Sequence, residues 1–233
     1  MPRIEPLFHV DTPSEDDISN FHRDGYLVYP NVFTDKAREG LIDAPLITSL
    51  LQTIIGSQYH FCHSALKLTG QGSRAIPLHQ DHHHWFHENE INLKEREKYY
   101  IQILYYPNGF KQGDSHLFVV PGSHLIFPLK EVTPERLLSG EFDKKTGRAL
   151  KENHLEVSPG SMIFINARIF HGVGPKPMDS SQKYRIFNID IFKEAGPPHR
   201  HTQKIPTRWV ESATPERKKL FQREPYTPNC WIN

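Results

Sequence analysis

Cysteine is scarce in this chain, and so is any excess of charge of one sign. Two cysteines, Cys62 and Cys230, among 233 residues are too few for a framework of disulfides. The 28 Lys and Arg residues are balanced by 27 Asp and Glu residues, and this net charge of +1 argues against nucleic acids or anionic membranes as partners. The composition therefore predicts a protein that folds without disulfides and has no polyanionic partner.

Long apolar runs and repeats are missing as well. No stretch approaches the roughly 20 apolar residues of a membrane helix, and the first residues, MPRIEPLFHVDTPSEDD, contain no apolar signal core. The sequence has no internal repeat and no low-complexity tract, which excludes a solenoid. A chain of this length fits one domain. We therefore expect a single cytoplasmic domain with no membrane partner.

The predicted organisation has three parts. They are a helical N-terminal part over about residues 12–56, a β-core over about residues 57–192, and a polar tail over residues 193–233. Ser14, followed by three acidic residues, predicts the start of a helix that ends at Gly25. A second, buried helix is expected over residues 41–55, and a short one over residues 215–222 of the tail.

Short apolar runs separated by Gly, Pro, Asn and Asp predict the strands of the β-core. The expected strands are Tyr26–Tyr29, Tyr59–Leu68, Tyr99–Tyr106, Leu117–Val120, His154–Val157, Ser161–Ile165 and Tyr184–Phe192. Residues 130–153, rich in Lys, Glu and Arg, predict an exposed insertion between strands. The expected fold is mainly β, with helices packed against a double-sheet barrel of the jelly-roll type.

Histidine is abundant, and the cluster that begins at His79 carries the strongest chemical signal. In the run His79-Gln80-Asp81 the imidazole and the carboxylate lie on the same side of a strand end, because side chains alternate. His171, 90 residues after Asp81, is the expected third ligand. Two imidazoles and one carboxylate on one face are the ligand set of non-haem Fe(II) oxygenases. The alternative is a hydrogen-bonded surface His beside an Asp, without a metal.

Arg185 lies fourteen residues after His171, inside the apolar strand Tyr184–Phe192. An arginine in such a strand is costly to desolvate unless it meets a carboxylate, with which its planar fork pairs through two hydrogen bonds. 2-Oxoglutarate chelates iron through its keto and neighbouring carboxylate oxygens, which leaves a distal carboxylate for this arginine. The alternative partner is an Asp or Glu of the protein itself.

Five stretches in order along the chain carry a family resemblance. They are Phe21–Val28, Leu78–Asp81, Leu117–His124, Pro159–Phe164, and His171–Gly172 followed by Arg185. With them the sequence resembles the phytanoyl-CoA dioxygenase family of Fe(II)- and 2-oxoglutarate-dependent oxygenases. The resemblance implies a double-stranded β-helix core with His79, Asp81 and His171 as iron ligands. It also implies that Arg185 binds 2-oxoglutarate, and the carboxylate at Asp81 favours hydroxylation over halogenation.

Three further residues are candidates for the interior of the barrel. In the strand Tyr59–Leu68, His63 and Lys67 share one face, opposite Cys62. We expect Lys67 to meet a carboxylate of 2-oxoglutarate or substrate and His63 to line the substrate pocket. A lysine whose amine reaches water at the strand end is the alternative. Gln102, among apolar and aromatic residues, is predicted to orient 2-oxoglutarate, or else to be a hydrogen-bonded core amide.

The run from His82 to Trp85 follows the predicted ligands directly. Neighbouring side chains alternate in direction, so the three histidines of this run cannot all face the metal. We assign His83 and Trp85 to the substrate pocket, with core packing as the alternative for Trp85. His124 is predicted to fix a turn rather than to bind metal.

The function that these residues predict is a dioxygenase using Fe(II), 2-oxoglutarate and O2. It would oxidise, by hydroxylation, a C–H bond of a small metabolite and release succinate and CO2. The alternative is a cupin-like protein that binds a metal or small molecule without turnover, which would leave Arg185 unexplained. A zinc hydrolase is a third reading, but no His-Glu-x-x-His motif is present.

Overall fold

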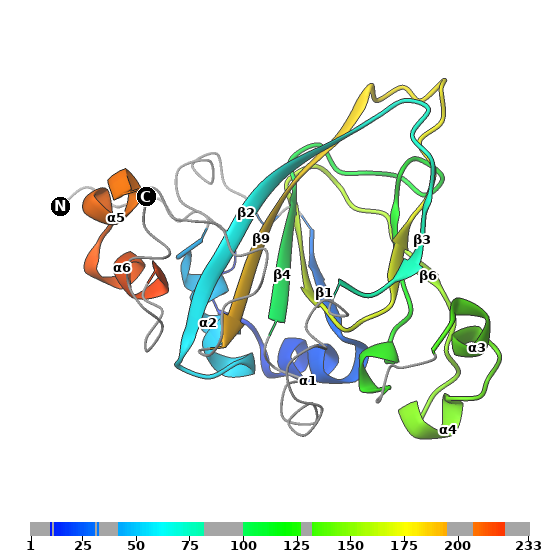
Figure 1. Cartoon of the computed structure of the whole chain (residues 1–233), viewed down its shortest axis with the longest axis horizontal. Helices are drawn as coiled ribbons and strands as arrows, with labels where there is room; N and C mark the ends of the chain where they lie inside the picture. The colour runs from blue at the N-terminus through cyan, green and yellow to red at the C-terminus, as the bar shows by residue number, and fades with distance from the viewer. Residues whose placement is uncertain are drawn as a thin grey trace.

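Two antiparallel sheets face each other in the computed structural model, which describes residues 10, 12–30, 32, 42–81, 100–126, 132–194 and 207–221 (Figure 1). The larger sheet has the order β1 (Tyr26–Tyr29), β7 (Ser161–Asn166), β4 (Tyr100–Tyr106), β9 (Tyr184–Glu194) and β2 (Tyr59–Gly70). The smaller sheet has the order β3 (Ile76–His79), β8 (His171–Val173), β5 (Leu117–Val119) and β6 (Asn153–His154). All pairings are antiparallel, and consecutive neighbours in a sheet lie far apart in the sequence.

Apolar side chains from both sheets fill the space between them. Leu104, Ile163 and Ile165 of the larger sheet pack with Leu117 and Val119 of the smaller one, and none of these is more than 4% exposed. Burial of this kind is the main favourable contribution to folding. The mainly β, jelly-roll architecture that the sequence predicts is confirmed.

Helices α1 (Glu15–Asp24) and α2 (Pro45–Ile54) cover the outer face of the larger sheet. Helix α1 begins as predicted, because the Ser14 hydroxyl accepts the Asp17 backbone N–H (3.1 Å) while the Asp17 carboxylate accepts the Ser14 N–H (2.8 Å). Phe21 carries this helix onto the sheet, with its ring centroid 5.3 Å from that of Phe164. Helix α2 is shorter than expected and starts at Pro45, a residue favoured in the first turn.

The remaining helices lie at the two sides of the sheets. The predicted insertion forms α3 (Pro134–Leu138) and α4 (Asp143–Thr146) beside the smaller sheet, and α5 (Thr207–Ser212) and α6 (Pro215–Phe221) lie beyond β2 (Figure 1). Helix α6 is the predicted tail helix, and it packs Phe221 edge-on against Phe61 of β2. None of the helices in the described ranges is long and apolar enough to cross a membrane.

The predicted strands are found, with two corrections. The strand expected over His154–Val157 is only Asn153–His154, and Val157 forms an isolated bridge with Phe110. Two short strands, β3 and β8, are absent from the predicted strand ranges, although a strand end was expected at His79 and a neighbouring strand near His171, and they carry two of the predicted metal ligands.

His124 fixes a turn, as predicted, and is 4% exposed. It lies in the 3-10 helix Ser123–Leu125, where its Nε2 donates a hydrogen bond to the His22 carbonyl (3.1 Å). Its ring packs onto Gly25, where φ is +84° and a Cβ would lie 2.5 Å from Nδ1. Burial lowers the pKa of His124 from its ordinary value to about 4. The folded protein therefore holds this imidazole neutral down to acidic pH.

A pH-dependent stability follows for His124. Between pH 6.5 and about 4 the unfolded chain binds a proton that the folded chain does not, so acid favours unfolding. Each pH unit in this window costs about 1.4 kcal/mol. We expect the advantage of the wild type over His124→Gln in unfolding free energy to fall by about 2 kcal/mol between pH 7 and pH 5. Urea unfolding of both proteins at the two pH values measures it.

The comparison with the variant is necessary because another buried group acts in the opposite direction. Burial raises the pKa of Asp190 to about 6, so its folded-state proton uptake stabilises the protein as pH falls. Asp190 is present in both proteins, so its contribution cancels in the difference between their unfolding free energies. Parallel pH curves for wild type and variant would show that His124 is not held neutral.

Candidate metal centre

His79 and His171 lie on neighbouring strands of the smaller sheet. His79 ends β3, His171 begins β8, and the two residues are direct partners in the antiparallel register. Their ring centroids are 4.4 Å apart. The sheet therefore brings together two imidazoles that are separated by more than ninety positions in the sequence.

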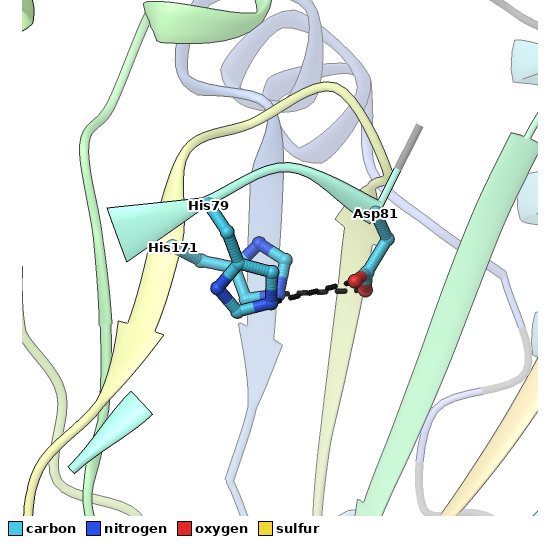
Figure 2. A group of neighbouring side chains, drawn as sticks. All are labelled: His79, Asp81 and His171. Atoms are coloured by element: carbon cyan, nitrogen blue, oxygen red, sulfur yellow. Dashed lines mark ion pairs between the residues drawn. The ribbon is translucent and has the colours of Figure 1, made fainter. Parts of the chain in front are cut away.

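Asp81 follows β3 and turns its carboxylate toward both imidazoles, as Figure 2 shows. Its Oδ1 is 3.4 Å from His79 Nε2, and its Oδ2 is 3.5 Å from His171 Nε2. One ligand atom of each residue lies within 4.8 Å of the other two. Three side chains gathered in this way could hold a single cation.

The other ring nitrogen of each histidine, Nδ1, forms a hydrogen bond with a nearby backbone carbonyl. His79 Nδ1 donates to the Pro77 carbonyl (2.8 Å), and His171 Nδ1 donates to the Ile169 carbonyl (3.1 Å), in both cases two residues earlier. A carbonyl only accepts, so Nδ1 carries the proton and a neutral ring directs the Nε2 lone pair toward Asp81. This is the arrangement by which a protein prepares a histidine to bind metal.

The charges in the centre also suit a cation. Burial favours the neutral acid, but the imidazoles of His171 and His79 outweigh it and hold the pKa of Asp81 well below its usual range. Burial opposes a charged imidazole at His79, but the Asp81 carboxylate and the Pro77 carbonyl raise the pKa of His79 overall. Asp81 is therefore an anion at neutral pH and fits an Fe(II) ion together with the two imidazoles.

Gln80, between the candidate ligands His79 and Asp81, links them to the loop before β8. Its buried side chain donates a hydrogen bond from Nε2 to the Arg168 carbonyl, and the Arg168 N–H in turn donates to Asn166 Oδ1 (2.9 Å). This connection spans the segments that carry Asp81 and His171. Sequence reasoning missed it, because the alternation that directs His79 and Asp81 to one side also directs Gln80 to the other.

Arg185 lies between the two sheets and is 2% exposed. Its Nη1 donates to the Ser115 carbonyl (2.5 Å) and its Nη2 to Thr69 Oγ1 (3.4 Å), and the guanidinium carbon is 4.7 Å from the ring centroid of Phe187. Burial lowers the pKa of Arg185 from its ordinary value. Within the described ranges no carboxylate lies within 4 Å of the guanidinium, and its Nε–H has no hydrogen-bond partner. The internal ion pair considered from the sequence is absent there.

Lys67 lies on the interior face of β2, together with Thr69, which is the strand partner of Arg185. Thr69 pairs with Arg185 in the register, and Lys67, two positions earlier, pairs with Phe187. Lys67 is exposed, and Phe187 and Ile189 beside it are half-buried. The interior positions of β4 and β7 are fully buried by comparison. The barrel is therefore open to solvent along β2 and β9, on the strands that carry Lys67 and Arg185.

The expected alternation along β2 is interrupted near His63. The register shifts between Phe61 and His63, which marks a β-bulge, and Cys62 packs with Ile191 and Ala167 on the interior side. The sequence analysis placed Cys62 on the opposite face from Lys67, and this is wrong because one extra residue reverses the alternation.

Gln102 has a partner that the sequence did not indicate. It is 3% exposed, and its Nε2 donates a hydrogen bond to Asp81 Oδ2 (2.6 Å). The amide thus contacts a predicted metal ligand, whereas the sequence analysis predicted a contact with 2-oxoglutarate. His83 and Trp85, with the rest of their run, lie outside the described residues, as does the side chain of His63.

Comparisons with known proteins concern the family and the fold of the chain. A model of the phytanoyl-CoA dioxygenase family matches residues 37–185, which is more than half of the chain. No curated protein matched. The fold is similar to that of SnoN, described as a non-heme alpha ketoglutarate dependent epimerase from nogalamycin biosynthesis. The identity is 17%, the TM-score is 0.59, and the match covers 78% of this chain and 80% of SnoN.

Two other structures share the fold. EctD from S. alaskensis, with bound Fe, is 16% identical with a TM-score of 0.62, and the match covers 83% of each chain. AviO1 from Streptomyces viridochromogenes Tue57 is 16% identical with a TM-score of 0.58, and the match covers 82% of this chain and 99% of AviO1. At such identities the similarity concerns the fold alone.

Proposed function

This chain belongs to the phytanoyl-CoA dioxygenase family, and from that premise we propose that it hydroxylates a C–H bond of a small metabolite with release of succinate and CO2. Members of the family are non-haem oxygenases, so the enzyme uses Fe(II), 2-oxoglutarate and O2. We further propose that the 233 residues form one oxygenase domain. The observation that carries the proposal is the facing arrangement of His79, Asp81 and His171.

These three side chains are the proposed iron ligands. Their fit to Fe(II) rests on the two free Nε2 lone pairs and the ionised carboxylate, which lie within 4.8 Å of one another. Bound iron and 2-oxoglutarate together supply the oxidising power, since oxidation of the keto acid to succinate and CO2 activates O2 for reaction with a C–H bond. The protein holds the ligands rigid, because His79 and His171 are fixed through their Nδ1 atoms.

Arg185 is the proposed partner of the distal carboxylate of 2-oxoglutarate. Its guanidinium is buried, has no ion-pair partner in the described ranges, and keeps N–H groups that the Ser115 and Thr69 contacts do not use. A carboxylate beside this buried guanidinium would gain charge-assisted hydrogen bonds. Lys67, nearer the open side of β2, would contribute a second positive charge toward an anionic co-substrate or substrate.

The proposed substrate is a small molecule. Two of the structural relatives have been crystallised with small molecules, SnoN with nogalamycin RO and EctD with 5-hydroxyectoine, each together with alpha ketoglutarate or 2-oxoglutarate. His63, His83 and Trp85 remain the predicted lining of the substrate pocket. A metabolite with an anionic group would suit the position of Lys67.

An anaerobic titration tests the oxygenase against a protein that only binds a metal. Fe(II) added to the apo-protein should give no visible band, and 2-oxoglutarate added next should produce a metal-to-ligand charge-transfer band. The reason is that chelation by the keto acid requires open positions on an iron held by three protein ligands. Absence of the band at saturating amounts of both components would contradict the proposal and favour a cupin-like binding protein. Succinate released from a panel of metabolites then identifies the substrate.

A further inference from the structure

Gln102 of β4 is a polar amide in a buried and apolar environment. Its register partners on either side are Ile165 and Ile191, both buried, and Gln102 itself is 3% exposed. Burying an amide among apolar side chains costs free energy unless its polar groups are hydrogen-bonded. The hydrogen bond that the Gln102 amide makes therefore indicates the role of a glutamine at this position.

That bond reaches across from the larger sheet to the smaller one. Gln102 Nε2 donates to Asp81 Oδ2 at 2.6 Å, and Asp81 follows β3 on the facing sheet. When the two imidazoles are neutral, as metal binding requires, their Nδ1 bonds place the proton on Nδ1, so His79 and His171 present lone pairs to the same carboxylate and do not donate to it. Among the described residues, the amide of Gln102 is then the one hydrogen-bond donor that orients Asp81.

We infer that Gln102 is a positioning residue of the metal centre, which holds the Asp81 carboxylate so that Oδ1 is left for the metal. The inference rests on the ligand set of the proposed function. With Oδ2 engaged by the amide, Asp81 would offer the metal one oxygen, and the two imidazoles would offer one nitrogen each. A metal held by these three atoms would keep more positions for 2-oxoglutarate and O2 than one to which Asp81 bound through both oxygens.

This role is distinct from the contact with 2-oxoglutarate that the sequence predicts for Gln102. A residue that acts through Asp81 changes the affinity for the metal when no 2-oxoglutarate is present. A residue that binds 2-oxoglutarate changes the affinity for the co-substrate after the metal is saturated. The two affinities are measured separately. A positioning role therefore changes the metal affinity, and a co-substrate contact changes the affinity for 2-oxoglutarate.

The test is the affinity of the apo-protein for Co(II) in the absence of 2-oxoglutarate. Gln102→Met keeps the length of the side chain and removes the donor, and we expect it to weaken Co(II) binding by about 10- to 100-fold, the usual effect of losing a partner of a metal ligand. The KM for 2-oxoglutarate at saturating Fe(II) should change less than about threefold. Gln182→Met is the matched control, because the Gln182 amide donates to the Asn108 carbonyl, outside the centre. It should leave Co(II) affinity unchanged.

A double-mutant cycle separates positioning from general packing. In an Asp81→Ala background, Gln102→Met should cause no further loss of Co(II) affinity, because the carboxylate on which it acts is gone. An equal loss in both backgrounds, or an unchanged Co(II) affinity with a raised KM for 2-oxoglutarate, would overturn the inference. If Gln102→Met unfolds, Gln102→Asn, which keeps the amide but shortens its reach, gives the same comparison.

Failure of the inference and failure of the proposed function can be told apart. Co(II) binding needs neither 2-oxoglutarate nor turnover. A protein that gives no charge-transfer band with Fe(II) and 2-oxoglutarate, yet loses Co(II) affinity in Gln102→Met, would retain the positioning role without the oxygenase function. A protein that gives the band but shows unchanged Co(II) affinity would be an oxygenase in which Gln102 has another role.

Discussion

Asp81→Ala is expected to abolish coupled succinate formation and to weaken Fe(II) binding by more than about 100-fold. Loss of a mere partner of a metal ligand costs about 10- to 100-fold in metal affinity, so loss of the ligand itself costs more. The remaining imidazoles of His79 and His171 would bind a divalent ion through two bonds and without a compensating negative charge. Fe(II) titration of the apo-protein and a succinate assay measure the two effects.

A matched control separates the ligand from a general effect of charge. Asp179 lies in the exposed loop between β8 and β9, and Asp179→Ala removes the same charge from the surface. We expect it to leave both iron affinity and succinate formation within about twofold of the wild type, as surface substitutions usually do. Full activity in Asp81→Ala, with normal iron binding, would show that the carboxylate of the centre is not a ligand.

Arg185→Lys is expected to raise the KM for 2-oxoglutarate by about 10- to 100-fold. Hydrogen bonds to charged groups contribute about 1.5–3 kcal/mol, and 1.4 kcal/mol corresponds to tenfold in an equilibrium constant. Lysine keeps the positive charge but loses the planar fork that binds a carboxylate through two bonds. Fe(II) affinity without 2-oxoglutarate should be unchanged, because Arg185 contacts Ser115, Thr69 and Phe187 but none of the proposed ligands.

A truncated co-substrate tests whether the effect comes from the distal carboxylate. 2-Oxobutyrate has the chelating keto acid but no distal carboxylate, so wild type and Arg185→Lys should bind it equally weakly. Arg217→Lys is the matched control, since Arg217 forms a two-bond ion pair with Asp43 outside the barrel, at 2.8 and 2.6 Å. A loss of 2-oxobutyrate binding equal to the loss of 2-oxoglutarate binding would show that Arg185 supports the fold of the site and not the carboxylate.

The regular elements of the fold were largely predictable because their signals are local. The cap at Ser14 and the stop at Gly25 bound α1 as expected, and continuous apolar runs marked β4, β7 and β9. The bounds of the two short strands β3 and β8 were not predicted, although a strand end was expected at His79. Each has only three or four residues, and they form because they pair with each other and with β5, which no local pattern reveals.

The candidate metal ligands were predictable for a different reason. A histidine and an aspartate two positions apart are forced to the same side by the alternation of side chains, and the apolar strand before His171 placed a second histidine where a neighbouring strand could return. The fixed tautomers of His79 and His171 were not predictable. They depend on carbonyl positions that only the backbone path from Pro77 and Ile169 sets.

The sequence by itself determined the class of fold, the candidate metal ligands and the presence of an arginine in an apolar strand, because periodicity, caps and residue chemistry act over a few positions. The tertiary structure alone decided which side chains meet. The Gln102 amide donates to the Asp81 carboxylate, and the Gln80 amide donates to the Arg168 carbonyl. Cys62 lies on the interior side because of a β-bulge. Each of these depends on strand register across two sheets, and a shift of one residue reverses the direction of every side chain.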